Sequence, residues 1–374
     1  MKQLIEHIGR HGPVSYGRYI DEALYGADGF YSRGGGAGSR RDFATSPEVG
    51  ALFGSVMAHA LDSWWDELNQ PDPFVVVEPG AGPGGLVASV LAAAPRCASS
   101  LRWLLVERSS AMRELQKQRR LPLVDASQIM GVVRGVPDED DDTVFLPDQG
   151  PLVAQLVEMP FGADVHLIVA NELLDNLAFD VAVLGESGWA EVRVGIDQRG
   201  GFIELAVPAS DEFREYCERF AGEVLVGTRI PIQKEAVRWL GEALSSVARG
   251  RVVLVDYGAT TAELATRPGG QWLRVYRDHR RSHDPMVAPG YSDITTDVAI
   301  DQLFAACPPT EVRTQADFLR AHGIDDIVVR AAAQAEREAA GSLAAIKLAS
   351  FISERDMVLD PSGLGGFLVM EWVR

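Results

Sequence analysis

The feature that most constrains this chain is an apolar run that ends in a glycine-rich turn. The residues Phe74–Val77 are followed by Glu78 and then by the glycine-rich segment 80–85. A helical pattern, Leu86–Ala94, begins directly after this segment. Because glycine tolerates positive φ and lets the main chain approach a ligand closely, a strand, a glycine turn and a helix in this order predict a ligand-binding turn.

The glycines fit two ligand-binding patterns. Gly80, Gly82 and Gly85 satisfy the dinucleotide pattern G-x-G-x-x-G, in which a helix N-terminus receives a pyrophosphate. Gly80, Gly82 and Gly84 instead satisfy E-x-G-x-G-x-G, the loop of S-adenosylmethionine (SAM) methyltransferases. Glu78 favours SAM, because a carboxylate repels a pyrophosphate and attracts the ammonium and sulfonium groups of SAM. A tight turn without any ligand is the third alternative.

A second acid stands at the end of the next predicted strand. The segment Leu101–Val106 has a strand pattern, and Glu107 follows it. In both kinds of nucleotide-binding fold an acid about 20 residues beyond the glycines holds the ribose hydroxyls. Glu107 therefore predicts a bound nucleoside without choosing between the two cofactors, and an ordinary exposed acid is the alternative.

Composition narrows the class of protein. The chain has 374 residues and a formal net charge of −18, which argues against nonspecific binding to nucleic acid or anionic membrane and suits a cationic substrate. Cys97, Cys217 and Cys307 have no paired spacing, so we expect no metal site and a reducing compartment. His279 and His283 could serve as a general base or bind a metal, but no third ligand accompanies them and a structural role is expected. Without a signal peptide or a membrane-length apolar run, a cytoplasmic protein is expected.

Strand and helix patterns alternate between residues 72 and 185. This alternation predicts an α/β, Rossmann-like fold with a mostly parallel sheet flanked by helices. Four regions are expected: an N-terminal helical or lid region 1–70, a SAM-binding core 71–187, an inserted subdomain 188–250, and the rest of the core sheet with substrate-side additions 251–374. Ligands in such sheets gather at the carboxyl ends of the strands. The polar residues at these predicted ends are Glu78, Glu107, Asn171 and Asp256.

Nine separate segments are similar to one family and follow its order. They are 12–16, 25–31, 42–48, 78–84, 106–109, 170–175, 256–258, 273–280 and 290–295. Among them are D-F-A-T-S-P-E at 42–48, N-E-L-L-D at 171–175 and D-Y-G at 256–258. The chain resembles the MidA-like SAM-dependent methyltransferases over nearly its whole length. The mitochondrial members of that family assist complex I assembly and methylate a protein arginine.

The resemblance implies a class I SAM methyltransferase fold and a cofactor site. Gly80, Gly82 and Gly84 would give the methionyl part of SAM access to the backbone. Glu78 would lie near the ammonium or, through water, the sulfonium, and Glu107 would take the ribose hydroxyls. Asn171 is expected beside the cofactor as well.

The same resemblance implies the acceptor site. Carboxylates can bind an arginine guanidinium bidentately, and Glu172 and Asp175 are three residues apart just past a predicted strand. The Asn171 amide could accept from the acceptor nitrogen, and the alternative is that Asn171 and Glu172 cap a helix. The segment 175–178 reads D-N-L-A where the family commonly has D-A-L-P. Because this segment is expected to line the substrate pocket, the difference concerns the identity of the substrate.

A glycine-rich loop, 32–42, precedes the predicted core. The hypothesis is that Asp42, Ser46 and Glu48 fold over SAM and the acceptor, with Glu48 adding charge to a cation pocket. The alternative is that Ser46 and Pro47 simply begin a helix.

The leading prediction is a SAM-dependent methyltransferase that acts on a protein arginine. Three alternatives remain open at this point: a small-metabolite O- or N-methyltransferase, a nicotinamide oxidoreductase, and a non-catalytic assembly factor that retains the SAM fold. The expected partner is a protein or small-molecule methyl acceptor, without nucleic acid or membrane, and a homodimer is compatible with the sequence.

Overall fold

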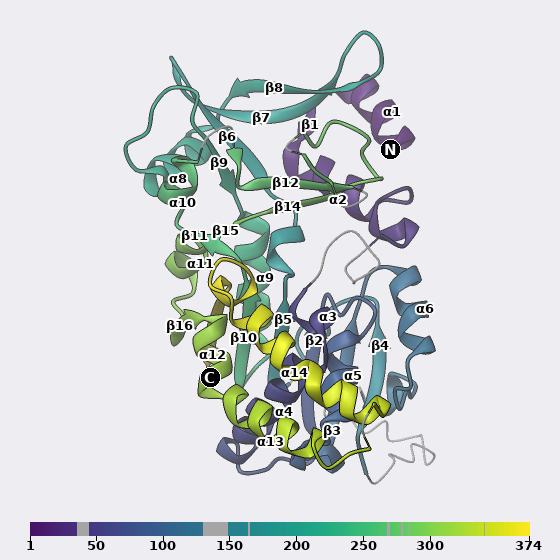
Figure 1. Ribbon diagram of the computed structural model, residues 1–374. Helices are drawn as coiled ribbons and strands as arrows, with labels where there is room; N and C mark the ends of the chain where they lie inside the picture. Colours follow the sequence, from purple (N-terminus) through teal and green to yellow (C-terminus); the bar gives the residue numbers. More distant parts are fainter. Residues whose placement is uncertain are drawn as a thin grey trace.

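The computed structural model describes residues 1–35, 45–129, 149–163, 165–267, 270–277, 280–282, 284–339 and 341–374. Asp42 and most of the proposed lid loop lie outside the described residues, as do His279 and His283. The described chain forms a β-rich upper part and a lower part in which helices flank a central sheet (Figure 1). Within the described residues, no helix has both the length and the apolar character needed to cross a membrane.

The central sheet has seven strands in the order β16-β17-β10-β5-β2-β3-β4. Their bounds are β2 Phe74–Pro79, β3 Leu101–Val106, β4 Leu152–Leu156, β5 Leu167–Asn171, β10 Arg251–Asp256, β16 Glu311–Thr314 and β17 Leu368–Val373. Strand β17 runs antiparallel to both of its neighbours, and all other neighbouring pairs are parallel. The predicted Rossmann-like α/β fold with a mostly parallel sheet is confirmed.

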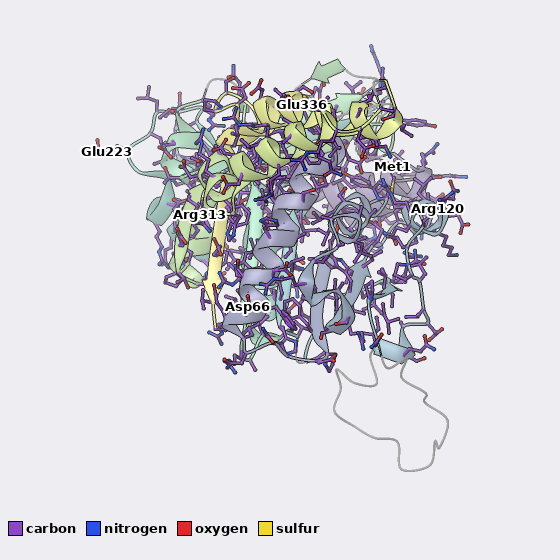
Figure 2. All side chains as sticks on the ribbon, turned by 60° about the horizontal axis from the view of Figure 1, so that its bottom comes forward. Met1, Asp66, Arg120, Glu223, Arg313 and Glu336 are labelled. Atoms are coloured by element: carbon purple, nitrogen blue, oxygen red, sulfur yellow. The ribbon has the colours of Figure 1, made fainter. Side chains whose placement is uncertain are left out.

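Helices cover both faces of this sheet, because its strands are apolar on both sides. Phe74 and Val76 of β2 pack into one core cluster, and the alternate residues Val75 and Val77 pack into another. The first face is covered by α4 Ala51–Glu67, α5 Gly85–Ala92, α12 Gln315–Ala321, α13 Ile324–Ala335 and α14 Leu343–Leu359. The second face is covered by α9 Lys234–Ser245 and α11 Ile300–Ala306. Figure 2 shows α13 and α14, near Glu336, lying across the first face.

The upper part is built around a five-stranded antiparallel sheet. Its strands are β1 Val14–Ser15, β6 Asp180–Gly185, β7 Gly188–Ile196, β8 Phe202–Pro208 and β9 Arg229–Ile232. Helices α1 Lys2–His11 and α2 Tyr16–Tyr25 and the three-stranded sheet of β12 Leu273–Arg277, β13 Arg280–Ser282 and β14 Asp293–Thr296 complete it. The expected boundary between 187 and 188 falls in the β6–β7 turn, and the division into four regions stays a prediction.

The upper part is held together by buried aromatic side chains. Tyr16 and Tyr19 of α2, Phe179 before β6 and Trp272 before β12 are fully buried in one cluster. Helix α2 begins where the Ser15 hydroxyl accepts a hydrogen bond from a backbone N–H of the first turn. This packing fixes α2 above the carboxyl ends of the central strands, so the N-terminal region covers these strand ends (Figure 1).

Candidate functional site

A cavity of about 550 Å³ opens at the carboxyl ends of β2, β3 and β5. It lies where strand order reverses, since β2 stands between β3 and β5, which is the usual ligand position in an open α/β sheet. The predicted site residues that line it are Glu48, Glu78, Gly80, Gly82, Glu107, Asn171, Glu172 and Asp175. Gly84 is absent from this lining.

The glycine turn after β2 is left-handed at three positions. The φ angles of Gly80, Gly82 and Gly84 are 67°, 51° and 75°. A Cβ on Gly82 would meet nothing within 4 Å, so this position faces open cavity. Gly84 is instead the N-cap of α5, and a Cβ there would lie 3.3 Å from the Gln116 side chain. Gly80 and Gly82 thus expose main chain to the cavity, while Gly84 turns the chain into the helix.

The N–H groups of this turn are largely satisfied within the protein. Gly82 donates to Glu107 Oε2 at 2.9 Å, Ala81 donates to a β3 carbonyl at 3.2 Å, and Gly84 donates to the Ala81 carbonyl at 2.9 Å. Pro83 has no N–H to give. A pyrophosphate needs several free N–H donors, so the turn does not suit the dinucleotide alternative.

Glu107 is buried and held in one orientation. Its carboxylate accepts from the backbone N–H of Gly82 at 2.9 Å and from that of Ser109 at 2.8 Å. Burial raises the pKa of Glu107, and these two hydrogen bonds act against that rise. Each carboxylate oxygen keeps further acceptor capacity toward the cavity, which fits the predicted contact with ribose hydroxyls.

Glu78 forms part of the cavity wall at the end of β2. Its Oε2 accepts a hydrogen bond from Trp103 Nε1 at 2.8 Å. Burial raises the pKa of Glu78 to about 8, while the Trp103 hydrogen bond lowers it. A cationic neighbour stabilises the charged form of a carboxyl that is desolvated in this way. The ammonium and sulfonium groups of SAM are such cations.

Asn171 and Glu172 lie side by side where β5 ends. Asn171 Nδ2 donates to Glu172 Oε1 at 3.0 Å, and Glu172 adopts a left-handed φ of 52° that a non-glycine residue rarely takes. Desolvation, followed by the charge of Asp175, raises the pKa of Glu172 to about 8. The alternative that these side chains cap the next helix is wrong, because the 3₁₀ turn Leu174–Asn176 has no side-chain cap from them.

The backbone of that 3₁₀ turn is held from the neighbouring strand. Asp256 Oδ2 accepts from the N–H of Leu174 at 3.0 Å and from that of Asp175 at 3.3 Å. The Tyr257 hydroxyl donates to Asp175 Oδ2. Neither Asp256 nor Tyr257 lines the cavity, so both residues hold the 3₁₀ turn from the side that faces away from the cavity.

Glu48 lies on the short helix α3 Ser46–Val49. The alternative that Ser46 and Pro47 begin a helix is therefore confirmed. The Glu48 carboxylate is 3.4 Å from the Arg119 guanidinium and would be 2.5 Å from a Cβ on Gly85. It lies over the start of α5, beside the glycine turn, and whether it closes as a lid stays a hypothesis.

Several lining residues carried no predicted role. The Tyr31 hydroxyl lies 3.1 Å from Asn176 Oδ1 and 3.1 Å from Asp293 Oδ1, which joins the N-terminal region to the 3₁₀ turn after β5 and to β14. The Tyr25 ring stacks on Tyr31 with centroids 5.3 Å apart. These residues lie in segments that carry the family resemblance, yet no spacing rule links positions more than 100 residues apart. A largely apolar wall is formed by Val157, Met159, Phe161 and Trp239.

Comparison with known proteins defines the class of this site. The model of the family described as "Putative S-adenosyl-L-methionine-dependent methyltransferase" matches residues 56–315. The chain belongs to this family and is a SAM-dependent methyltransferase. The turn with exposed main chain, the fixed Glu107 and the buried Glu78 fit that cofactor.

Two curated relatives are mitochondrial. The protein arginine methyltransferase NDUFAF7 of Mus musculus is 28% identical over 353 residues, which cover 87% of this chain and 74% of the relative. The NDUFAF7 homolog of Drosophila melanogaster is 27% identical over 311 residues, which cover 79% and 67% of the two chains. Both are named as protein arginine methyltransferases.

The fold matches solved structures over its full length. A superfamily member from Burkholderia thailandensis, solved with bound S-adenosyl-homocysteine, superposes with a TM-score of 0.80 at 25% identity and covers 100% of this chain and 91% of that chain. A second structure from the same organism gives a TM-score of 0.79 at 23% identity, with the same coverage. S-adenosyl-homocysteine is the product that remains when SAM has given up its methyl group.

Proposed function

We propose that this methyltransferase transfers the methyl group to a guanidinium nitrogen of a protein arginine. The observation that carries the proposal is the pair of acids Glu172 and Asp175, which line the same cavity as the glycine turn. Both have a pKa raised by desolvation, to about 8 and about 6. Asp256 lies directly behind them and its pKa is also raised, first by desolvation and then by the charges of the other two.

A guanidinium group suits this arrangement for physical reasons. It is always charged at neutral pH and presents a planar fork of donors that two carboxylates can bind. A cation placed between Glu172 and Asp175 would relieve both the repulsion between them and the loss of water around them. The names of the curated relatives support the same acceptor class.

The test uses a lysate from cells that lack the enzyme, incubated with purified protein and SAM carrying an isotope-labelled methyl group. Mass spectrometry should find the label on arginine side chains of one or a few proteins. Glu172→Gln should reduce labelling by roughly 100-fold or more, because the substituted side chain cannot ionise to pair with the guanidinium, while SAM binding persists.

The matched control is Glu186→Gln, which makes the same chemical change at an exposed position between β6 and β7. It should label arginine as the wild type does. Label found only on small molecules would contradict the proposal and favour a metabolite acceptor. The cytoplasmic location and a homodimer stay predictions alongside it.

A further inference from the structure

We infer that Asp175 accepts the proton that the acceptor nitrogen loses, and that Tyr257 is the positioning residue that keeps the Asp175 carboxylate ready for it. The inference rests on the proposed function, because an arginine nitrogen loses one proton for each methyl group it gains. The N–H bond breaks with its electron pair left on nitrogen, an O–H bond forms on Asp175, and the proton then passes to solvent.

Asp175 is held at two points by neighbouring residues of one strand end. Its backbone N–H donates to Asp256, and its Oδ2 accepts from the Tyr257 hydroxyl. Asp175 is 3% exposed, and no donor in the described part of the chain reaches its Oδ1. Because Asp175 also lines the cavity, Oδ1 is the oxygen left to receive a ligand proton.

Tyr257 is itself fixed in place. The Arg274 guanidinium lies over its ring at 4.5 Å from the centroid, and the Phe367 ring lies 5.1 Å away. Arg274 forms an ion pair with Asp297, which also pairs with Arg267. A ring packed in this way cannot easily turn its hydroxyl away from Asp175, so the hydrogen bond sets the orientation of the carboxylate.

Glu172 is less suited to take the proton. Its carboxylate already accepts from Asn171 Nδ2 at 3.0 Å and receives a hydrogen bond from the Ser46 backbone. Its pKa of about 8 means that it is mostly protonated in the free protein at neutral pH, whereas the pKa of Asp175 is about 6. The two acids therefore have different tasks, with Glu172 binding the cation and Asp175 accepting the proton.

The charge state of Asp175 depends on groups from several elements. Desolvation raises its pKa first, and the Tyr257 hydrogen bond and the Arg274 charge lower it. The charged and titratable groups that face it are Tyr257 and Asp256 at the end of β10, Arg274 on β12, Asp297 after β14, Glu172 beside it, and Tyr25 and Tyr31 from the N-terminal region. Removal of either Tyr257 or Arg274 should therefore raise the pKa of Asp175.

The test is an NMR titration of the free protein labelled with ¹³C at the aspartate carboxyl carbons. The Asp175 signal is the one missing from Asp175→Asn. Tyr257→Phe should move its midpoint up by roughly one pH unit. Tyr291→Phe removes a hydroxyl from an exposed tyrosine and should leave the midpoint unchanged. A midpoint that stays in place in Tyr257→Phe would overturn the inference.

Arg274→Gln is the second variant, and it tests the inference if Tyr257→Phe does not fold. It leaves the Tyr257 hydroxyl in place and should also raise the midpoint, because the lowering charge is gone. An unchanged midpoint in this variant would count against the inference in the same way.

Activity on an arginine peptide gives an independent readout. Tyr257→Phe should lower kcat roughly twofold at pH 7 and roughly fivefold at pH 6, with little change in KM, and kcat should recover as the pH rises. An equal loss at every pH would mean that Tyr257 is only structural and would contradict the inference. A wild-type enzyme that methylates no arginine peptide contradicts the proposed function instead, so the two failures are distinguishable.

Discussion

Buried acids at the two ends of the central sheet have different partners. Toward the amino end of β10, Glu371 is 1% exposed and lies between Arg251, at 2.9 Å, and Arg313. At the carboxyl end, no ion pair among the described residues includes Glu172 or Asp175. The charge of Glu371 is matched by two arginines within the fold, whereas acids without a matched cation leave a place for a cationic ligand. Figure 2 shows Arg313 beside the edge of the sheet.

The largest expected effect is on stability at the amino end. Glu371→Gln removes the buried charge partner of Arg251 and Arg313 and leaves them only the exposed acids Glu67 and Glu311. Breaking a buried pair of this kind costs about 3–5 kcal/mol. Thermal unfolding should therefore shift to clearly lower temperature, while the folded protein still binds SAM. Glu67→Gln is the control, because Glu67 pairs with Arg251 from an exposed position and should cost under about 1 kcal/mol. If both variants melt like the wild type, the comparison fails.

The second prediction is that a substitution at the carboxyl ends of the central strands raises the free energy of unfolding. The pKa of Glu172 is raised in the folded state, so its contribution to stability is present below the unfolded pKa and is lost as the pH rises through about 8. The side chain in Glu172→Gln cannot ionise, so this variant does not lose stability as the pH rises. Its free energy of unfolding at pH 9 should exceed that of the wild type by at least about 1 kcal/mol. The two proteins should be nearly equal at pH 4. Urea unfolding at both pH values measures this, and a less stable variant at pH 9 would contradict it.

The smallest effect is a proton released on binding. At pH 7 a carboxyl with a pKa of about 8 is mostly protonated, and a guanidinium can pair only with the charged form. Binding of an arginine peptide should therefore release roughly 0.9 proton from Glu172. Calorimetry in two buffers of different ionisation enthalpy detects this release. Binding of the peptide without proton release would show that Glu172 does not face the cation.

The meeting of the predicted cofactor residues at one cavity could be predicted from sequence, because each of them stands at or just beyond the end of an apolar strand. Gly80, Gly82 and Glu107 end or follow two apolar runs, and parallel strands bring their carboxyl ends to one edge. The same rule predicted Asn171 at the third strand end. Gly84 follows the same pattern, but only its positive φ and its place at the N-cap of α5 show that it shapes the turn.

The arrangement around Glu172 and Asp175 depends on contacts that no local sequence pattern contains. Tyr31 meets Asn176 across 145 positions, and Tyr257 meets Asp175 across 82. The left-handed φ of Glu172 has no sequence signal either, because glutamate seldom adopts it. The upper sheet was only partly foreseen, since its short strands come from separate segments of the chain and pair only in the folded state.

The most direct test of the account is a calorimetric titration of the purified protein with SAM and S-adenosyl-homocysteine, beside Gly82→Val. The valine side chain would project into open cavity, so the wild type should bind both ligands and the variant neither. Gly200→Val carries a similar positive φ, with nothing near its Cβ, in the turn between β7 and β8, and it should bind like the wild type. Binding that survives in Gly82→Val, or a wild type that binds neither ligand, would contradict the assignment of this cavity.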